Sequence, residues 1–210
     1  VETVDAVPAN TKLIDVYDGK VSMESFVASL DDTQLANLAN GISGASTSGD
    51  TWGADANSVT GAAGETSQLY FNSLGIPNTV EADGPAGIRV TAETTDKDGN
   101  AVYNYCTAFP IGTLLAQTWN KELAREVGES MGQEFSDVKN YGWYGPAMNT
   151  HRSAFAGRNF EYYSEDGVLA GYLAMNQVNG AVSKGVYPYV KHFAVNDQET
   201  NRESFLLTFV

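Results

Sequence analysis

Three short apolar stretches in this chain each run into a polar or turn-forming end, and this recurrence constrains the fold more than any other feature. The stretches and the residues that close them are Asn78–Ala82 with Asp83-Gly84-Pro85, Gly142–Tyr144 with Gly145-Pro146, and Val186–Val190 with Lys191-His192. Short strands separated by helices are typical of a parallel sheet, in which the carboxyl ends of the strands carry the chemistry. The sequence therefore predicts an α/β fold.

Helical patterns fill the intervals between these strands. The first pattern has apolar residues at i+4 spacing, at Leu123, Val127, Met131 and Phe135. The second begins at about Ser164, with Glu165 and Asp166 in its first turn, where the helix dipole favours anions. An eight-unit barrel needs roughly 250 residues, and about three such units fit here. We therefore expect a partial (β/α)8 TIM-type barrel that is truncated before completion.

The N-terminal region has a different pattern. Residues 1–21 read as a linker or the tail of a preceding domain, closed by a turn at Asp18-Gly19, and residues 22–210 as the N-terminal portion of the barrel domain. Ser22 is a candidate N-cap for one helix, and Asp31 with Gln34 resembles a capping box for a second helix that Gly41 ends. Residues 41–64, rich in Gly, Ser, Thr and Ala, read as a loop around Trp52; loops of this length are more often functional than idle.

Charge and cysteine usage exclude several classes of partner. The formal net charge is -14, and no Lys/Arg cluster is present, so we expect neither a nucleic acid nor an anionic membrane surface as partner. Cys106 is the single cysteine, and His151 and His192 are the two histidines, so no zinc-ligand set can be assembled and we expect no metal or other cofactor. No signal peptide or 18-residue apolar run is present, but both ends look cut, so the compartment stays open between cytoplasmic and secreted.

Asp83, Lys191 and His192 are the first candidate site residues, because they follow apolar strands directly. The carboxylate of Asp83 would project into a cleft, although Asp-Gly-Pro also favours an Asp that only stabilises its own turn. Lys191 and His192 would point to opposite faces of a regular strand, whereas a bulge would present both. Judged by its position alone, a lysine at a strand end is more often a cation at the surface or at the rim of the core than a ligand contact.

Arg152 and Arg158 flank a glycine-containing loop, and three acids follow Arg158: Glu161, Glu165 and Asp166. They form either a surface ion-pair network or an arginine fork for hydroxyl groups in a cleft. The aromatics nearby are most simply core, but one or two in a cleft would make a platform for a sugar: Trp143, Tyr144, Tyr162 and Tyr163.

Other catalytic patterns are weak. No G-x-S-x-G elbow accompanies His192, and H-E-x-x-H is absent. The segment Gly84–Gly87 lacks the P-loop pattern, and Pro85 removes an N–H donor.

Three blocks carry a resemblance to a known family: ADGPAGIR (82–89), GPAMNTHRSAFAGRNFEYYSED (145–166) and KHFAVNDQETNRES (191–204). Together they resemble glycoside hydrolase family 3 of the β-glucosidase type, over about residues 22–210. The resemblance implies a (β/α)8 barrel with an α/β sandwich domain after it or, in permuted members, before it, and the opening of this chain is similar to the permuted kind. It also implies a retaining exo-glycosidase that acts on a small-molecule glycoside or oligosaccharide with two carboxylates.

Carried over by motif, the resemblance places Asp83, Arg158, Lys191 and His192 at positions that bind the hydroxyls of the terminal sugar. Arg152 matches an arginine that is frequent in this subgroup. Glu161, Glu165 and Asp166 match positions that we interpret as structural.

The chain also departs from the family pattern. The family nucleophile is an Asp in a Ser/Thr-Asp-Trp/Tyr motif, and this motif does not occur here. We expect the nucleophile and the acid/base elsewhere, on the same or a second chain, and the isolated chain to be poorly soluble and inactive. The alternative is a non-catalytic carbohydrate-binding or regulatory remnant of such a barrel.

Overall fold

The structure is a computed structural model, and it describes residues 4–5, 7–8, 10–40, 59–66 and 69–202. Most of the predicted 41–64 loop, including Trp52, lies outside the described residues, as does Gly41, the expected end of a helix. The five predicted site residues are all described.

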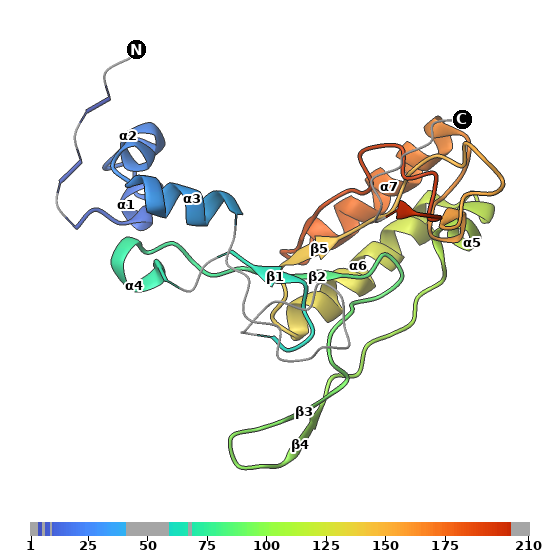
Figure 1. Ribbon diagram of the computed structural model, residues 1–210, viewed down its shortest axis with the longest axis horizontal. Helices are drawn as coiled ribbons and strands as arrows, with labels where there is room; N and C mark the ends of the chain where they lie inside the picture. Colours follow the sequence, from blue (N-terminus) through green and yellow to red (C-terminus); the bar gives the residue numbers. More distant parts are fainter. Residues whose placement is uncertain (1–3, 6, 9, 41–58, 67–68, 203–210) are drawn as a thin grey trace.

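A four-stranded sheet organises the molecule (Figure 1). Its strands follow the order β1 (Gly64–Glu65), β2 (Val80–Asp83), β5 (Gly142–Tyr144) and β6 (Tyr187–Pro188). The prediction of parallel strands is confirmed, because β2 pairs parallel with β5 and β5 pairs parallel with β6. The antiparallel edge strand β1 was not predicted, since two residues carry no readable alternation.

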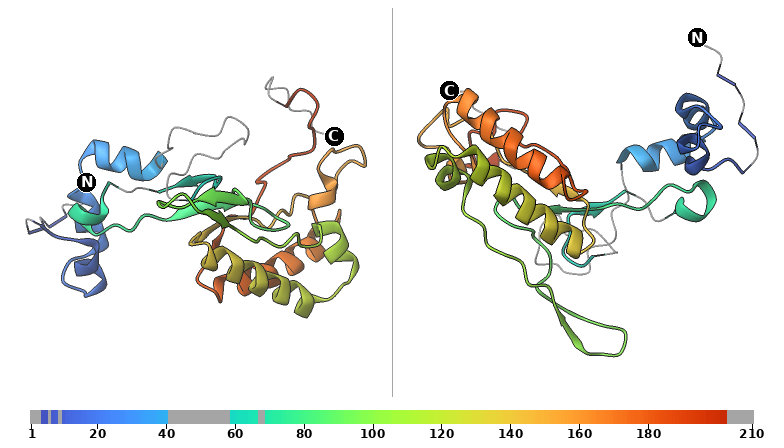
Figure 2. Two further views of the ribbon diagram at one scale, coloured as in Figure 1. Left: turned by 90° about the horizontal axis from the view of Figure 1, so that it is seen from below. Right: turned by 180° about the vertical axis from the view of Figure 1, so that it is seen from behind.

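Two long helices, α6 (Lys121–Asp137) and α7 (Gly167–Val182), lie side by side on one face of the sheet (Figures 1 and 2). The predicted helix from about Ser164 begins three residues later than expected. The carboxylate of Asp166 accepts hydrogen bonds from the amides of Val168 and Leu169, at 2.8 and 3.4 Å, so Asp166 is the N-cap and does not belong to the first turn.

Alternation along the strands divides their side chains between two faces. Val80 and Ala82 of β2 pack with Trp143 of β5 against the helices, in a core that also contains Met131, Phe135, Ala181 and Val186. Glu81 and Asp83 therefore point away from the helices, as strand periodicity requires. Three parallel strands, with α6 and α7 on one face and polar side chains on the other, form a portion of an α/β barrel wall.

Short helices make up the N-terminal region: α1 (Leu13–Tyr17), α2 (Met23–Ala28), α3 (Asp32–Asn40) and α4 (Phe71–Leu74). Both predicted caps are confirmed. Ser22 accepts a hydrogen bond from the amide of Ser25, and Asp31 and Gln34 exchange backbone-to-side-chain bonds of 2.8 and 2.9 Å. The turn at Asp18-Gly19 is also present, with Gly19 at φ 72°. The interpretation of residues 1–21 as a linker or tail stays a prediction.

The connection after β2 contains elements that the sequence did not suggest. A hairpin of β3 (Glu93–Thr95) and β4 (Ala101–Tyr103) projects from the body in Figure 1, and α5 (Gly112–Gln117) follows it. The loop after β5 contains a short 3-10 helix, η1 (Asn159–Glu161). In the described part of the chain, no helix combines the length and apolarity needed to cross a membrane.

Glycines allow α6 and α7 to approach closely. A Cβ atom on Gly128 of α6 would lie 2.1 Å from the carbonyl oxygen of Gln177, and one on Gly180 of α7 would lie 2.3 Å from that of Arg125. Both obstructing atoms are backbone, which cannot move out of the way as a side chain can. The helix layer that supports the sheet therefore requires glycine at these contacts.

We predict that Gly180→Ala lowers the free energy of unfolding by about 1 to 3 kcal/mol, because the added methyl group pushes the helices apart. Gly171→Ala is the matched control, since it lies in the same helix with no atom within 4 Å of the new methyl group. The control should leave stability unchanged or raise it by roughly 0.5 to 1 kcal/mol, through helix propensity. Denaturant unfolding of both variants measures the difference, and equal stabilities would contradict the close-packing argument.

Candidate functional site

Asp83 and Lys191 form an ion pair at the carboxyl end of the parallel sheet. The Nζ atom of Lys191 donates to Oδ1 of Asp83 at 2.6 Å, and the amide of Gly84 donates to the same oxygen at 2.8 Å. The turn-stabilising bond considered from the sequence is therefore present, but it is one of several contacts. A guanidinium nitrogen of Arg89 lies 3.6 Å from the other carboxylate oxygen.

Partial burial and positive neighbours act in opposite directions on the pKa of Asp83. Burial raises this pKa, but the hydrogen bond and charge of Lys191, the Gly84 amide and the charge of Arg89 together hold it below its ordinary value. Asp83 is thus an anion at neutral pH. It is an acceptor-only group, already oriented by a cation and an amide.

Backbone bonds past the end of β6 place Lys191. Its amide donates to the carbonyl oxygen of Pro146 at 3.1 Å, and its own carbonyl accepts from the amide of Met148 at 2.7 Å. This bridge ties the Lys191 segment to the loop after β5, beyond the regular strand. The peptide bond between Lys191 and His192 is cis.

His192 lies beside Tyr162, whose hydroxyl oxygen is 2.7 Å from its Nδ1 atom. Burial and the positive charges of Arg158, Lys191 and Arg202 lower the pKa of His192 to about 4, and the negative charge of Asp83 opposes this only in part. His192 is therefore neutral at physiological pH and close to the other charged residues of the site.

Arg158 is held by acids that follow it. It forms an ion pair with Glu161, and its second nitrogen lies 3.9 Å from a carboxylate oxygen of Glu199. Burial lowers the pKa of Arg158, but the bond and charge of Glu161 outweigh burial, so the net shift is upward. The ion-pair network expected from the sequence is therefore present and largely buried, and the charge of Arg158 acts on His192. The interpretation of Arg158 as a fork for hydroxyl groups stays a prediction.

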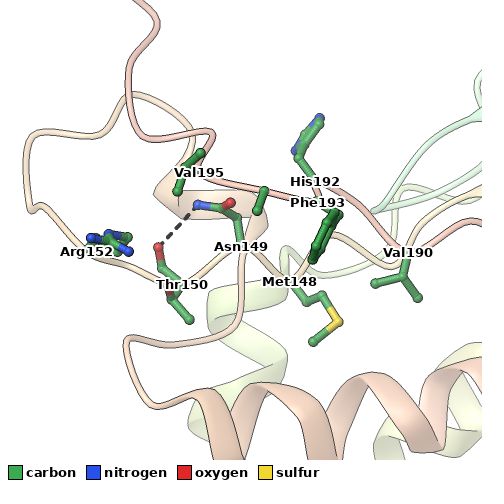
Figure 3. A pocket seen from close by; sticks show the side chains of 9 residues that line it. Met148, Asn149, Thr150, Arg152, Val190, His192, Phe193 and Val195 are labelled. Atoms are coloured by element: carbon green, nitrogen blue, oxygen red, sulfur yellow. Dashed lines mark hydrogen bonds between the residues drawn. The ribbon is translucent and has the colours of Figure 1, made fainter. Parts of the chain in front are cut away.

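Arg152 has a different environment from the other four candidates. Its Nε atom lies 3.7 Å from Oδ2 of Asp197, a carboxylate that is 2% exposed, and Asn149 donates to the other oxygen of Asp197 at 3.2 Å. Arg152 lines a cavity of about 260 Å³ between the loops that follow β5 and β6 (Figure 3). The cavity also includes His192, but not Asp83, Arg158 or Lys191.

The structure therefore gathers Asp83, Lys191, His192 and Arg158, and it places Arg152 at the adjoining cavity. Two residues were missed: Arg89, beside Asp83, and Arg202, whose charge acts on His192. Both lie in the sequence blocks quoted above, where ADGPAGIR ends in Arg89 and NDQETNRES contains Arg202. The signal that could have identified them was an arginine within a block that already contained a predicted site residue.

The simpler interpretation of the four aromatic residues as core is confirmed for three of them and wrong for Tyr144. Trp143, Tyr162 and Tyr163 are buried. Tyr144 instead faces away from the helices and donates to Glu81 at 2.7 Å, as does Tyr189 at 2.6 Å. Within the described residues, no group of three or more His, Cys, Asp or Glu side chains is placed to hold a metal ion.

Comparison with known proteins identifies the family. The protein-family model described as "Glycosyl hydrolase family 3 N terminal domain" matches residues 62–204 of this chain. The chain belongs to glycoside hydrolase family 3. In this family the N-terminal domain is a TIM-type barrel, and the sheet and helices described above are part of one.

Relatives support the same assignment. Beta-glucosidase A from Butyrivibrio fibrisolvens is 40% identical over 91% of this chain and 20% of its own length. An exo-alpha-(1->6)-L-arabinopyranosidase from Bifidobacterium longum is 43% identical over 62% of this chain and 17% of its own length. Among solved structures, beta-glucosidase 3B from Thermotoga neapolitana in complex with glucose has a TM-score of 0.70 and 42% identity, covering 83% of this chain and 23% of that one. The chain thus spans about a fifth of the length of the relatives it matches.

We predict that the imidazole C–H resonances of His192 titrate with a pKa of about 4, well below the ordinary 6.5. The imidazole of His192 takes up its proton at higher pH in the unfolded chain than in the folded one. The free energy of unfolding is therefore at its full value above about pH 6.5 and decreases as the pH falls towards 4. Proton NMR titration measures the pKa, and His192→Gln should remove this part of the pH dependence of unfolding. A titration near 6.5 would contradict the burial and charges assigned to the ring.

Proposed function

We propose that the protein containing this chain is a retaining exo-glycosidase of the β-glucosidase type, which hydrolyses terminal β-linked sugars. This chain contributes part of the subsite for the terminal sugar. The residues proposed to contact its hydroxyl groups are Asp83, Arg158, Lys191 and His192, with Arg152 at the adjoining cavity.

One observation carries the proposal: Asp83, Lys191 and His192, which lie in two separate family blocks, meet at the carboxyl end of β2 and β6. A carboxylate accepts hydrogen bonds from sugar hydroxyls, while ammonium and imidazole groups donate to the hydroxyl oxygens. Since each group is already held by the fold, little order is lost when a sugar binds. Active sites of barrel enzymes lie at this same end of the strands.

The relatives favour a pyranoside substrate. Several are β-glucosidases, and solved structures similar to this chain contain glucose, whereas others act as arabinopyranosidases. Glucose and L-arabinopyranose both carry ring hydroxyls at C2, C3 and C4, but L-arabinopyranose lacks the hydroxymethyl group and has the opposite configuration at C4. We propose glucose as the preferred sugar, because beta-glucosidases are frequent among the relatives and a similar solved structure contains glucose.

Retaining hydrolysis needs two carboxyl groups about 5 to 5.5 Å apart across the scissile bond, one as nucleophile and one as acid/base. We assign neither role within this chain. Asp83 is committed to Lys191, Gly84 and Arg89, which suits ground-state and transition-state binding better than attack on the anomeric carbon. The remainder of the barrel and an α/β sandwich domain, on the same or a second chain, are the proposed source of both carboxyl groups.

A second candidate is a non-catalytic carbohydrate-binding or regulatory barrel. These 210 residues, about a fifth of the length of the relatives, contain sugar-binding candidates but no Ser/Thr-Asp-Trp/Tyr motif, so they fit either candidate. The second candidate differs from the first in one measurable respect, because it would bind glucose without releasing it from a glycoside.

We predict that the complete protein releases glucose from an aryl β-glucoside with retention, giving the β-anomer first in proton NMR spectra taken during the reaction. Asp83→Ala should lower kcat/KM by about 30- to 1,000-fold, equivalent to about 2 to 4 kcal/mol for a charge-assisted bond and its unpaired partners. Asp98→Ala, an exposed aspartate on the hairpin, is the matched control and should leave kcat/KM unchanged.

The outcomes separate the candidates. Glucose binding without turnover would favour the non-catalytic barrel. A fall of less than threefold for a folded Asp83→Ala protein would contradict a role of Asp83 in sugar binding and leave only its turn-stabilising bond to Gly84.

A further inference from the structure

Tyr162 links His192 to Asn196 through a single hydroxyl group. The Tyr162 side chain is fully buried, and its hydroxyl oxygen lies 2.7 Å from Nδ1 of His192 and 2.7 Å from Nδ2 of Asn196. The two rings meet edge to face, with centroids 5.9 Å apart and planes at 86°. Within the described residues, these two hydrogen bonds are the ones that the hydroxyl makes.

The hydrogen bonds of this hydroxyl determine which ring nitrogen of His192 carries the proton. The Asn196 amide donates to the phenolic oxygen, so it occupies an oxygen lone pair and leaves the hydroxyl hydrogen for another acceptor. The acceptor in reach is Nδ1 of His192. If Nδ1 carried a proton instead, the buried hydroxyl hydrogen would have no acceptor, which is a costly arrangement.

A neutral imidazole with an unprotonated Nδ1 carries its proton on Nε2. We propose that Tyr162 and Asn196 are positioning residues that hold His192 in the Nε2–H tautomer and so make it a hydrogen-bond donor to the oxygen of a sugar hydroxyl. The part of this inference that concerns sugar rests on the proposed function, whereas the tautomer does not.

The surroundings of the ring agree with this state. Three cations act on His192, namely Arg158, Lys191 and Arg202, against the single anion Asp83. This excess of positive charge and the partial burial of the ring keep it neutral, so Nδ1 remains free to accept from Tyr162. Within the described residues Nε2 has no hydrogen-bond partner, and His192 lines the cavity in Figure 3.

A donor at this place has a consequence for specificity. An Nε2–H group binds an oxygen or fluorine acceptor but gains nothing from a sugar hydrogen. At the sugar position that His192 contacts, replacing the hydroxyl with fluorine should therefore weaken binding less than replacing it with hydrogen. An unprotonated Nε2 would require a hydroxyl hydrogen from the sugar, and fluorine and hydrogen would then be equally poor replacements.

The first test reads the tautomer directly. In the complete protein with ¹⁵N-labelled histidine, at neutral pH and without sugar, a correlation spectrum should show Nε2 of His192 as a pyrrole-type nitrogen and Nδ1 as a pyridine-type nitrogen. The signals are assigned by their loss in His192→Gln. A pyridine-type Nε2 would overturn the inference, and this measurement needs neither activity nor a positioning variant.

The second test reverses the donor. Asn196→Asp is nearly isosteric, but its carboxylate can only accept, so it should take the Tyr162 hydroxyl hydrogen and leave the phenolic oxygen to accept from His192. The pyrrole-type signal should then move from Nε2 to Nδ1. An unchanged tautomer in a folded Asn196→Asp protein would overturn the role of Asn196.

The third test measures the effect on the reaction. Tyr162→Phe should lower kcat/KM roughly tenfold and populate both tautomers. Tyr163→Phe is the matched control, because it removes a neighbouring buried hydroxyl that bonds to Gln177 and not to His192; it should leave the tautomer unchanged. A wild-type tautomer in Tyr162→Phe would contradict the proposed role of the hydroxyl. A correct tautomer in a protein that hydrolyses no glycoside would instead contradict the proposed function alone.

Discussion

The parallel pairing of β2, β5 and β6 over a single helix layer is the constraint on which the candidate site depends. Because the strands run in the same direction, their carboxyl ends lie at the same end of the sheet. Because the helices cover one face of the sheet, the polar residues of β2 must point to the opposite face. Asp83 is the last residue of β2, so both conditions apply to it at once. The close glycine contacts between α6 and α7 hold together the helix layer on which the sheet packs.

Charge at the site contrasts with the charge of the chain. Acidic residues outnumber basic ones by 26 to 12 in the sequence, yet cations and His192 gather around Asp83. Carboxylates hold most of these cations: Asp83 holds Lys191 and Arg89, while Glu161 and Glu199 hold Arg158. Lys191 and Arg158 are thus largely buried and held in orientation, whereas the Arg89 side chain is half exposed. Preorganised donors of this kind bind hydroxyl groups with little loss of side-chain entropy.

The family assignment and the site geometry contribute different information. Membership in glycoside hydrolase family 3 rests on the match over residues 62–204 and on relatives that are longer than this chain. The contacts explain how individual side chains would serve such a protein: a carboxylate kept anionic by its neighbours, a guanidinium fixed by acids, and a neutral histidine. Arg152 illustrates the limit of a motif match, since its contact with the buried Asp197 places it at a cavity beside the cluster.

Local sequence determined the elements whose signals are local. Ser22 and Asp31 cap helices where they occur, since capping depends on residues within one turn, and apolar residues marked α6 and β2. The sequence blocks also determined the family. Tertiary structure alone decided that Lys191 meets Asp83 across 108 residues, that Asp197 is buried against Arg152, and that Tyr162 lies between Asn196 and His192. These contacts join distant segments, and no short-range periodicity records them, because their energies depend on the strand register and loop paths that only the folded chain fixes.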